Sequence, residues 1–340
     1  MKKVLFVNGS GMSTFIDPIK HRLHSMNEYE CRHLIMDMYG YKKNEWEIVY
    51  SHYEWADVIW FEWANELTLA LTKMAGDLIG GGGTLGGQIL NQKKVIIRLH
   101  AYESFTDWPK HINWNCVDDI MFVASHVRDR IAETLTKVKV VPEVSIIPNG
   151  VDLDKFAFEP KWHQQKPLEF DPGFNLAYVG YLNWKKGSVL LLHAFRALVE
   201  IDNRYRLHIA GRFQSIPEQQ YWVKMIKDLG LTKNIVLDGW RDDLSEWFKG
   251  KGQIICSSIT EACPVGILEG MASGLRPIIH DYIGRDSIFP PEFVWKSIDD
   301  FVESVKSPFS ENDSMGYREW IEVDHDFDAQ ILRIRQVIDG

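Results

Sequence analysis

The chain has 340 residues, of which 45% are hydrophobic and 25% charged, a balance typical of a soluble globular protein. Its net charge of −9 argues against a nucleic-acid-binding protein, which usually carries a basic surface. The same charge argues against broad adhesion to an anionic membrane, although a local basic patch would still allow peripheral membrane contact. The sequence contains no apolar run of about 20 residues, so no transmembrane segment is predicted. At this length we expect two domains.

The N-terminal apolar run, Val4–Val7, is too short for the core of a signal peptide and is followed by a Gly/Ser turn. We interpret it as a buried first strand. The four cysteines include no C-x-x-C pair, so in the absence of a secretory signal we expect reduced thiols. Together these features predict a cytoplasmic protein.

In the first half of the chain, short β-rich apolar runs alternate with longer helical segments, which is typical of βα units around a parallel sheet. The predicted strands are 3–8, 30–36, 58–62, 94–99, 120–123 and 144–147. The predicted helices are 14–26, 66–78 and 127–135. Ser125 is expected to cap the last of them, and the glycine-rich stretch 80–87 is expected to form a mobile loop.

The motif Pro148-Asn149-Gly150 interrupts this alternation, and residues 151–172, with three prolines, are interpreted as an interdomain linker. The alternation then restarts. Further strands are predicted at 175–179, 206–210, 235–238, 253–257 and 277–280. Helices are predicted at 188–200, at 266–273, between a Ser215 cap and Gly230, and over most of 317–338. The fold class is therefore α/β, with two doubly wound domains.

Ligands of doubly wound folds bind at the carboxyl ends of strands, where three motifs of this chain fall. The Gly9–Ser13 turn, with Gly11, lets backbone N–H groups approach an anion, although it also suits a plain tight turn. His100 could act there as an acid, a base or a hydrogen-bond donor, whereas a lone histidine is more often structural. Lys186, one residue before Gly187, could reach a diphosphate or could be a solvated turn lysine.

The most informative motif is a glutamate pair between a predicted strand and a predicted helix. Glu261 falls in the loop, and Glu269 falls about one turn into the helix. Carboxylates accept hydrogen bonds from vicinal sugar hydroxyls. The backbone N–H groups of Val265, Gly266 and Ile267 at the helix N-terminus suit a diphosphate. Two glutamates eight residues apart are common by chance, so this motif depends on its context.

In that context the chain resembles the retaining glycosyltransferases of family 4, which have the GT-B fold. The resemblance covers nearly the whole chain, is clearest in the second half, and depends on several motifs in a fixed order. These motifs are Ile147–Asp152, Val179–Gly187, Ile209–Gly211, Glu261–Glu269 and Met271–Gly274, followed by Pro277.

The resemblance implies two Rossmann-like doubly wound domains facing a central cleft. Residues 1–160 would form an acceptor-side domain and residues 170–315 a donor-binding domain, with the helix 317–340 packing back on the first. The implied activity is a retaining, hexosyl-type, metal-independent transfer from a nucleoside diphosphate sugar to an acceptor hydroxyl. No cofactor is implied beyond the donor as co-substrate. The acceptor stays open among saccharides, lipid-linked molecules and small molecules.

The resemblance also implies a role for each matching residue. Glu261 would contact the hydroxyls of the donor sugar, and Glu269 would hold the ribose. Lys186 would neutralise the leaving diphosphate, and Gly11 would let the first loop approach it. His100 would lie near the acceptor and the transferred sugar.

This chain departs from the family pattern at two positions. Tyr181 stands where family members commonly carry an arginine, so the diphosphate would depend on Lys185 or Arg212 for its second positive charge. Pro264 stands where the family often has a glycine, which leaves open which N–H groups donate.

Three other classes remain as alternatives to a transferase. One is a nucleotide-sugar epimerase or a phosphorylase with the same architecture. A second is a catalytically silent sugar-binding or scaffold homologue, which both departures keep open. A nicotinamide-dependent dehydrogenase is disfavoured because the G-x-G-x-x-G motif is missing.

Two further features are candidate sites. Trp60 and Trp63 flank Glu62 at a strand end, where an aromatic face could stack on a sugar, but core packing is the commoner role of such residues. The acidic pairs Asp118–Asp119 and Asp242–Asp243 do not predict a metal site.

Overall fold

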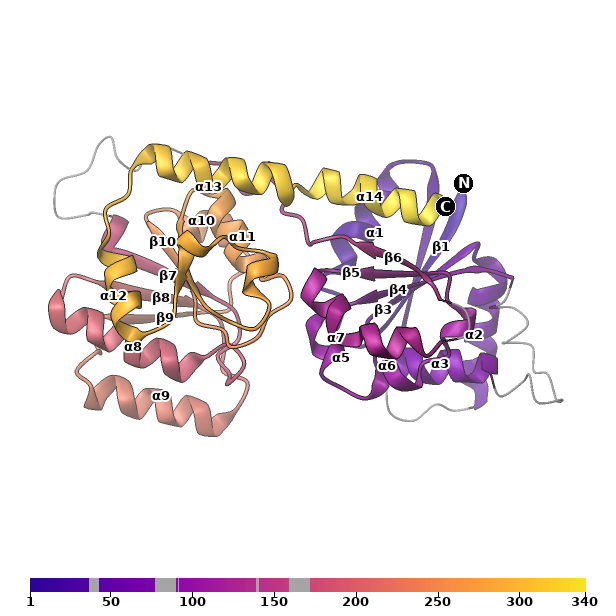
Figure 1. Ribbon diagram of the computed structural model, residues 1–340, viewed down its shortest axis with the longest axis horizontal. Helices are drawn as coiled ribbons and strands as arrows, with labels where there is room; N and C mark the ends of the chain where they lie inside the picture. The colour runs from indigo at the N-terminus through magenta and orange to yellow at the C-terminus, as the bar shows by residue number, and fades with distance from the viewer. Residues whose placement is uncertain (37–42, 77–89, 91, 139–140, 159–171) are drawn as a thin grey trace. The chain divides into compact units, whose positions relative to one another are not determined.

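The structure is a computed structural model that describes residues 1–36, 43–76, 90, 92–138, 141–158 and 172–340. The chain divides into two compact units, one of residues 1–148 and 329–340 and the other of residues 149–328 (Figure 1). The predicted glycine-rich loop 80–87 and residues 159–171 of the predicted linker lie outside the described residues.

The first unit contains a six-stranded sheet in the order β2-β1-β3-β4-β5-β6, and all of its neighbouring strands are parallel. The strands are β1 Lys2–Gly9, β2 Tyr29–Met36, β3 Val58–Glu62, β4 Lys94–Leu99, β5 Asp119–Phe122 and β6 Glu143–Ile146. The central strands are almost entirely buried, as expected for a parallel sheet whose faces are covered by helices. All six strands match the predicted ones to within one residue at either end.

Most helices of the first unit connect these strands. They are α1 Ile16–Ser25, α2 Lys43–Trp55, α3 Glu66–Gly76, α5 Ala101–Ser104, α6 Trp108–His111 and α7 Ser125–Thr136. Helices α2, α5 and α6 were not predicted from the sequence. The Ser125 cap was wrong, because Ser125 is already the first residue of α7 and the N-cap, Ala124, has no side chain that could accept a hydrogen bond.

The second unit contains a second parallel sheet in the order β12-β11-β10-β7-β8-β9. Its strands are β7 Asn175–Val179, β8 Arg206–Ala210, β9 Ile235–Gly239, β10 Gln253–Cys256, β11 Arg276–His280 and β12 Val294–Trp295. Its helices are α8 Ser188–Ile201, α9 Ile216–Asp228, α10 Leu244–Phe248, α11 Val265–Ala272, α12 Ile298–Lys306 and α13 Glu311–Asp324. The Ser215 cap is confirmed, because its hydroxyl accepts the Glu218 N–H at 3.3 Å.

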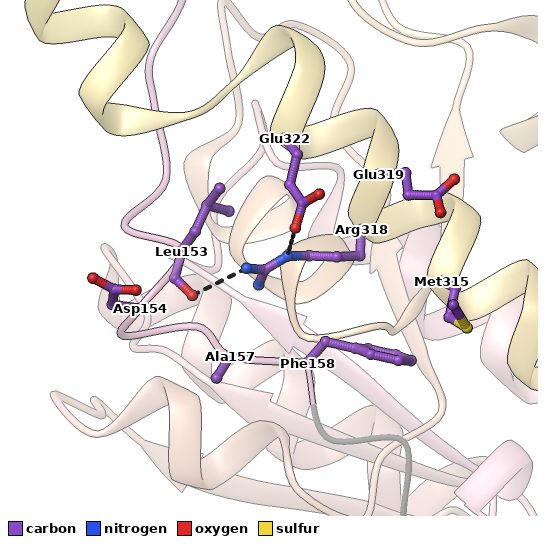
Figure 2. A pocket seen from close by; sticks show the side chains of 8 residues that line it. All are labelled: Leu153, Asp154, Ala157, Phe158, Met315, Arg318, Glu319 and Glu322. Carbon is purple, nitrogen blue, oxygen red and sulfur yellow. Dashed lines mark hydrogen bonds and ion pairs between the residues drawn. The ribbon is translucent and has the colours of Figure 1, made fainter.

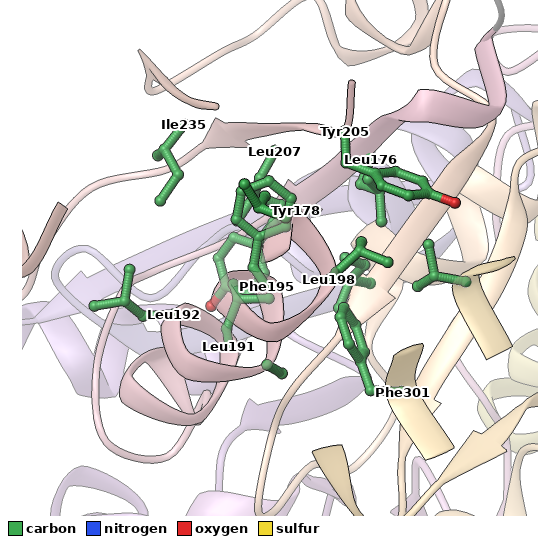
Figure 3. Close-up of a cluster of buried hydrophobic side chains, with 14 of the residues drawn as sticks. Leu176, Tyr178, Leu191, Leu192, Phe195, Leu198, Tyr205, Leu207, Ile235 and Phe301 are labelled. Carbon is green, nitrogen blue, oxygen red and sulfur yellow. The ribbon is translucent and has the colours of Figure 1, made fainter. Parts of the chain in front are cut away.

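The core of the second unit forms between α8 and the strands beside it. Leu191, Phe195 and Leu198 repeat at helical spacing along α8 and are fully buried. Figure 3 shows these side chains directed toward Leu176 and Leu207 of the neighbouring strands. This packing holds β7 and β8 together, and the loops after both strands carry candidate site residues.

The predicted helical segment 317–338 is two helices, α13 and α14 Phe327–Asp339, with a break at His325. At the break, Val151 donates its N–H to the carbonyl of His325 at 2.8 Å and accepts the N–H of Phe327 at 3.1 Å. A Cβ on Gly150 would stand 2.6 Å from the Cα of Phe327, so only glycine fits there. The segment after Pro148 therefore takes hydrogen bonds that a continuous helix would have made.

Helix α14 contributes most of its residues to the first unit. Asp339 accepts a hydrogen bond from the Tyr29 hydroxyl at 2.7 Å and forms an ion pair with Lys2 at 3.2 Å. The two ends of the chain therefore lie side by side (Figure 1). Among the described residues, no helix combines the length and apolar character needed to cross a membrane.

Candidate active site

Two glycines bring together the carboxyl ends of β7 and β8 in the second unit. Gly180, directly after β7, has φ of +133°, a conformation that side chains disfavour. A Cβ on Gly211, directly after β8, would lie 1.9 Å from the carbonyl oxygen of Gly180. This close approach excludes any side chain at position 211. At this edge of the sheet the backbones of Gly180 and Gly211 therefore lie directly against each other.

The loop from β7 to α8 fixes the backbone of Lys186 against the end of β10. The Lys186 N–H donates to Oδ1 of Asn183 at 2.9 Å, and its carbonyl accepts the Ser257 hydroxyl at 2.8 Å. Gly187 has φ of +61°, and a Cβ there would lie 1.9 Å from the Ser257 carbonyl oxygen. The lysine side chain therefore starts from a rigid position.

Lys186 and Glu261 form an ion pair at this edge, which brings together two of the predicted site residues. Their side chains are only 28% and 14% exposed, respectively. The Ser258 hydroxyl donates to the same carboxylate oxygen of Glu261 at 2.8 Å. Burial alone would lower the pKa of Lys186, but the Glu261 carboxylate outweighs it and the pKa is raised. The lysine is therefore charged at neutral pH, and its charge is balanced by Glu261.

Helix α11 starts beside this pair and carries Glu269. A Cβ on Gly266 would stand 2.9 Å from Cγ1 of Val179, so the glycine lets the helix pack on the end of β7. Val265 and Gly266 contribute the first N–H groups of the helix. The Ile267 N–H already donates to the Pro264 carbonyl at 2.9 Å, so it is occupied within the turn.

Burial raises the pKa of the Glu269 carboxyl from its usual 4.5 to about 7, although the charge of Lys155 acts in the opposite direction. The folded protein therefore keeps a proton that the unfolded chain loses as the pH rises from about 4.5. Stability contributed by this group is lost between about pH 4.5 and 7 and stays lost above that window.

Glu269→Gln is consequently expected to be more stable than the wild type at pH 8, by at most about 3 kcal/mol. At pH 4.5 the two proteins should be nearly equally stable, because both side chains are then neutral. Urea unfolding at both pH values tests this, with exposed Glu292→Gln as a control that should show no such difference. Equal stability of Glu269→Gln and wild type at pH 8 would contradict the raised pKa.

Arg212 lies in an aromatic cluster after β8. Its guanidinium donates to the Tyr181 hydroxyl at 2.9 Å and lies over the rings of Tyr181 and Trp240 at 5.1 and 5.0 Å. Trp240 is 52% exposed, so the cluster is open to solvent. The ammonium of Lys185 lies over the Trp184 ring at 5.9 Å. Arg212 and Lys185 thus both border the loop that holds Lys186.

The two predicted site residues of the first unit follow β1 and β4. Gly11 has φ of +73°, and nothing stands within 4 Å of the place of a Cβ, so its backbone is open to an approaching group. His100 is only 4% exposed, and its Nε2 lies 2.8 Å from Oε1 of Glu62. The histidine is therefore paired inside the protein.

Sequence reasoning missed the residues that support the predicted ones, including Asn183, Ser257, Ser258 and Glu62. Ser257 and Ser258 come directly after β10, where ligand-facing residues are expected, and that position was the available signal. Nothing in the sequence links Asn183 to Lys186 or Glu62 to His100, because these contacts depend on loop and strand geometry.

A pocket of about 510 Å³ lies elsewhere in the second unit, between residues 153–158 and α13 (Figure 2). Arg318 crosses it to the Leu153 carbonyl at 3.2 Å and forms an ion pair with Glu322 at 2.6 Å. The lining residues are Leu153, Asp154, Ala157, Phe158, Met315, Arg318, Glu319 and Glu322. None of them is a predicted site residue.

Comparison with solved structures identifies the fold. Anabaena HepE in complex with UDP-glucose matches with a TM-score of 0.76 over 100% of both chains, at 13% identity. A glycosyltransferase from Rickettsia africae matches with a TM-score of 0.73 over 99% of this chain and 97% of its own, also at 13% identity. With two parallel six-stranded sheets, the protein therefore has the GT-B fold.

Sequence comparison identifies the second unit more closely. Residues 160–312 match the family "Glycosyl transferases group 1", so this part of the chain is a group 1 glycosyl transferase domain. An Escherichia coli relative, UDP-Gal:alpha-D-GlcNAc-diphosphoundecaprenol alpha-1,3-galactosyltransferase, is 28% identical over 44% of this chain and 40% of its own length. The GDP-mannose:cellobiosyl-diphosphopolyprenol alpha-mannosyltransferase of Xanthomonas campestris is 27% identical over 44% and 37%, respectively. The chain thus matches less than half the length of either relative.

Proposed function

We propose that the protein transfers a sugar from a nucleoside diphosphate sugar to an acceptor hydroxyl with retention of anomeric configuration, as a family 4 enzyme. The observation that carries the proposal is the Lys186–Glu261 ion pair, held by Ser258 at the carboxyl edge of the second sheet. The relatives support it, since their names specify UDP-Gal and GDP-mannose, and a structural neighbour binds UDP-glucose.

In this proposal the donor competes with Glu261 for the charge of Lys186. A diphosphate carries more negative charge than a carboxylate, so it would draw the lysine toward itself. Glu261 would then be free to accept hydrogen bonds from the sugar hydroxyls. The N–H groups at the start of α11 would further stabilise the negative charge of the diphosphate.

Transfer would proceed on the front face of the sugar. The bond between the anomeric carbon and the phosphate oxygen breaks, the acceptor oxygen bonds to the same carbon, and the acceptor proton moves to the leaving phosphate. The protein acts by positioning the reactants and stabilising charge. We further infer that the lysine and the helix N-terminus replace a metal ion, so activity should survive EDTA.

The Glu269 carboxylate would accept hydrogen bonds from the ribose hydroxyls. Arg212 is the preferred source of a second positive charge, because within the described part of the chain its guanidinium contacts only the neutral aromatic side chains of Tyr181 and Trp240. Lys185 is the alternative. The two named relatives act on diphospho-polyprenol acceptors, which makes lipid-linked saccharides the first acceptors to test.

Thermal-shift titration with UDP, GDP and their sugar derivatives tests the donor site, because a bound ligand raises the melting temperature. We expect a shift with at least one nucleotide, and we expect Lys186→Ala to abolish it. Parallel titrations of Arg212→Ala and Lys185→Ala show which side chain supplies the second charge. If no nucleotide or nucleotide sugar changes the melting temperature, the proposal is wrong.

Turnover separates the proposed reaction from its alternatives. A transferase releases nucleoside diphosphate only when an acceptor is present. An epimerase instead changes the configuration of the sugar and needs no acceptor. Binding without turnover across lipid-linked and free saccharide acceptors would favour a silent homologue. NMR of the product tests retention through its anomeric configuration.

A further inference from the structure

A fully buried carboxylate, Glu62, ends strand β3 in the first unit and is 1% exposed. Its Oε2 accepts the indole N–H of Trp60 at 2.9 Å, and its Oε1 accepts a guanidinium N–H of Arg98 at 3.3 Å. Glu62 lies opposite Arg98 in the parallel pairing of β3 and β4. Since side chains two residues apart share a face of a sheet, Trp60 and His100 join the same cluster.

The charges of this cluster determine where the proton of His100 lies. Burial raises the pKa of Glu62, but Arg98 and the hydrogen bonds from His100 and Trp60 outweigh it, and the pKa is lowered. Glu62 is therefore a carboxylate, which can only accept hydrogen bonds. Because Nε2 of His100 lies 2.8 Å from Oε1 of Glu62, Nε2 must carry a hydrogen.

Aromatic packing fixes the plane of the same histidine ring. Trp63 stacks on His100 with ring centroids 4.1 Å apart, and Phe15 contacts it at 5.2 Å. Trp63 itself has φ of +83°, a strained conformation for a residue with a side chain. Its backbone N–H donates to the Arg98 carbonyl at 2.9 Å, and its indole N–H donates to the Met12 carbonyl at 3.1 Å. The ring that covers His100 is therefore held in place from two sides.

We propose that Glu62 is a positioning residue that keeps the proton of His100 on Nε2 and so leaves Nδ1 as the ring nitrogen that accepts hydrogen bonds. The kinetic part of this inference depends on the proposed transfer reaction and on the family resemblance, which implies that His100 lies near the acceptor. The charged groups that face His100 are Glu62 from β3, Arg98 from β4 and Glu103 from α5. The Glu62 carboxylate hydrogen-bonds to Nε2 of His100, and the backbone N–H of Glu103 donates to the His100 side chain in a capping box.

The tautomer can be measured by ¹⁵N NMR on the full chain labelled at its 12 histidines, with His100→Gln used to assign the signal. We expect Nε2 of His100 to be protonated at every pH from 6 to 9. An unprotonated Nε2 anywhere in that range would overturn the proposal. This measurement follows the wild type without substrate, so its outcome does not depend on turnover.

Glu62→Gln provides the second measurement. The glutamine carbonyl can still accept from Nε2, but the negative charge that favours a proton there is gone. We expect a lower kcat, while the thermal shift produced by the donor should not change. A folded Glu62→Gln protein with wild-type kcat would refute the positioning role.

Glu103→Gln is the matched control. Glu103 is as buried as Glu62, and burial raises its pKa, but its Oε1 accepts the backbone N–H groups of Ala64 and His100 at 3.0 and 3.3 Å. Its substitution should leave the proton of His100 on Nε2. If the chain transfers no sugar at all, the proposed function is wrong. The NMR measurement still tests the position of the His100 proton, because it needs no substrate.

Discussion

Glu261→Gln is expected to lower kcat by about 100- to 1,000-fold, the typical cost of removing one interaction that stabilises the transition state. The amide cannot accept hydrogen bonds on both of its terminal atoms, so it loses contacts to the sugar hydroxyls. It also leaves Lys186 without its anionic partner. Steady-state kinetics with the donor identified by thermal shift would measure the effect.

Another lysine–glutamate pair of the second unit provides the control. Lys249 and Glu246 lie 2.7 Å apart on the exposed side of α10, with side chains 48% and 67% exposed. Glu246→Gln should leave kcat unchanged and alter stability by less than about 1 kcal/mol, as is usual for a surface pair. A folded Glu261→Gln protein with wild-type turnover would contradict the role of Glu261.

Gly211→Ala is expected to destabilise the second unit by about 3 kcal/mol or more, because its Cβ would overlap the carbonyl oxygen of Gly180 at 1.9 Å. The obstacle is backbone in the sheet, which cannot rotate away as a side chain would. In calorimetry the melting temperature of this unit should fall by roughly 6–12 °C.

Gly316→Ala is the matched control for this substitution. Gly316 lies within α13, and nothing stands within 4 Å of the place of its Cβ. Alanine should therefore stabilise the helix by roughly 0.5–1 kcal/mol. Equal melting temperatures for Gly211→Ala and the wild type would show that the ends of β7 and β8 do not approach as described.

Much of the fold could be predicted from the sequence, because parallel strands are short apolar runs with clear ends. Strands β3, β4, β7 and β8 were predicted with their observed bounds. The break between α13 and α14 could not be predicted, since it arises when the backbone of Val151, far away in the sequence, takes hydrogen bonds at His325 and Phe327. Helix α2 was missed because its mixed polar and aromatic sequence lacks a clear apolar stripe.

The sequence indicates residues for the candidate site but not the contacts between them. Strand ends and ordered motifs indicated Lys186 and Glu261, yet their direct ion pair depends on how the loop after β7 meets the end of β10. The occupied N–H of Ile267 likewise depends on the turn at Pro264. Burial of His100 against Glu62 comes from strand register, which one sequence does not reveal.

The path of the chain through the two units has a consequence for biosynthesis. The chain passes from the first unit to the second after Pro148 and returns to the first unit at Ala329. The second unit is one uninterrupted stretch. A ribosome therefore delivers every residue of the second unit before residues 329–340, which complete the first. Until α14 emerges, Tyr29 and Lys2 lack their partner Asp339, and the surface that α14 covers on the first unit stays exposed.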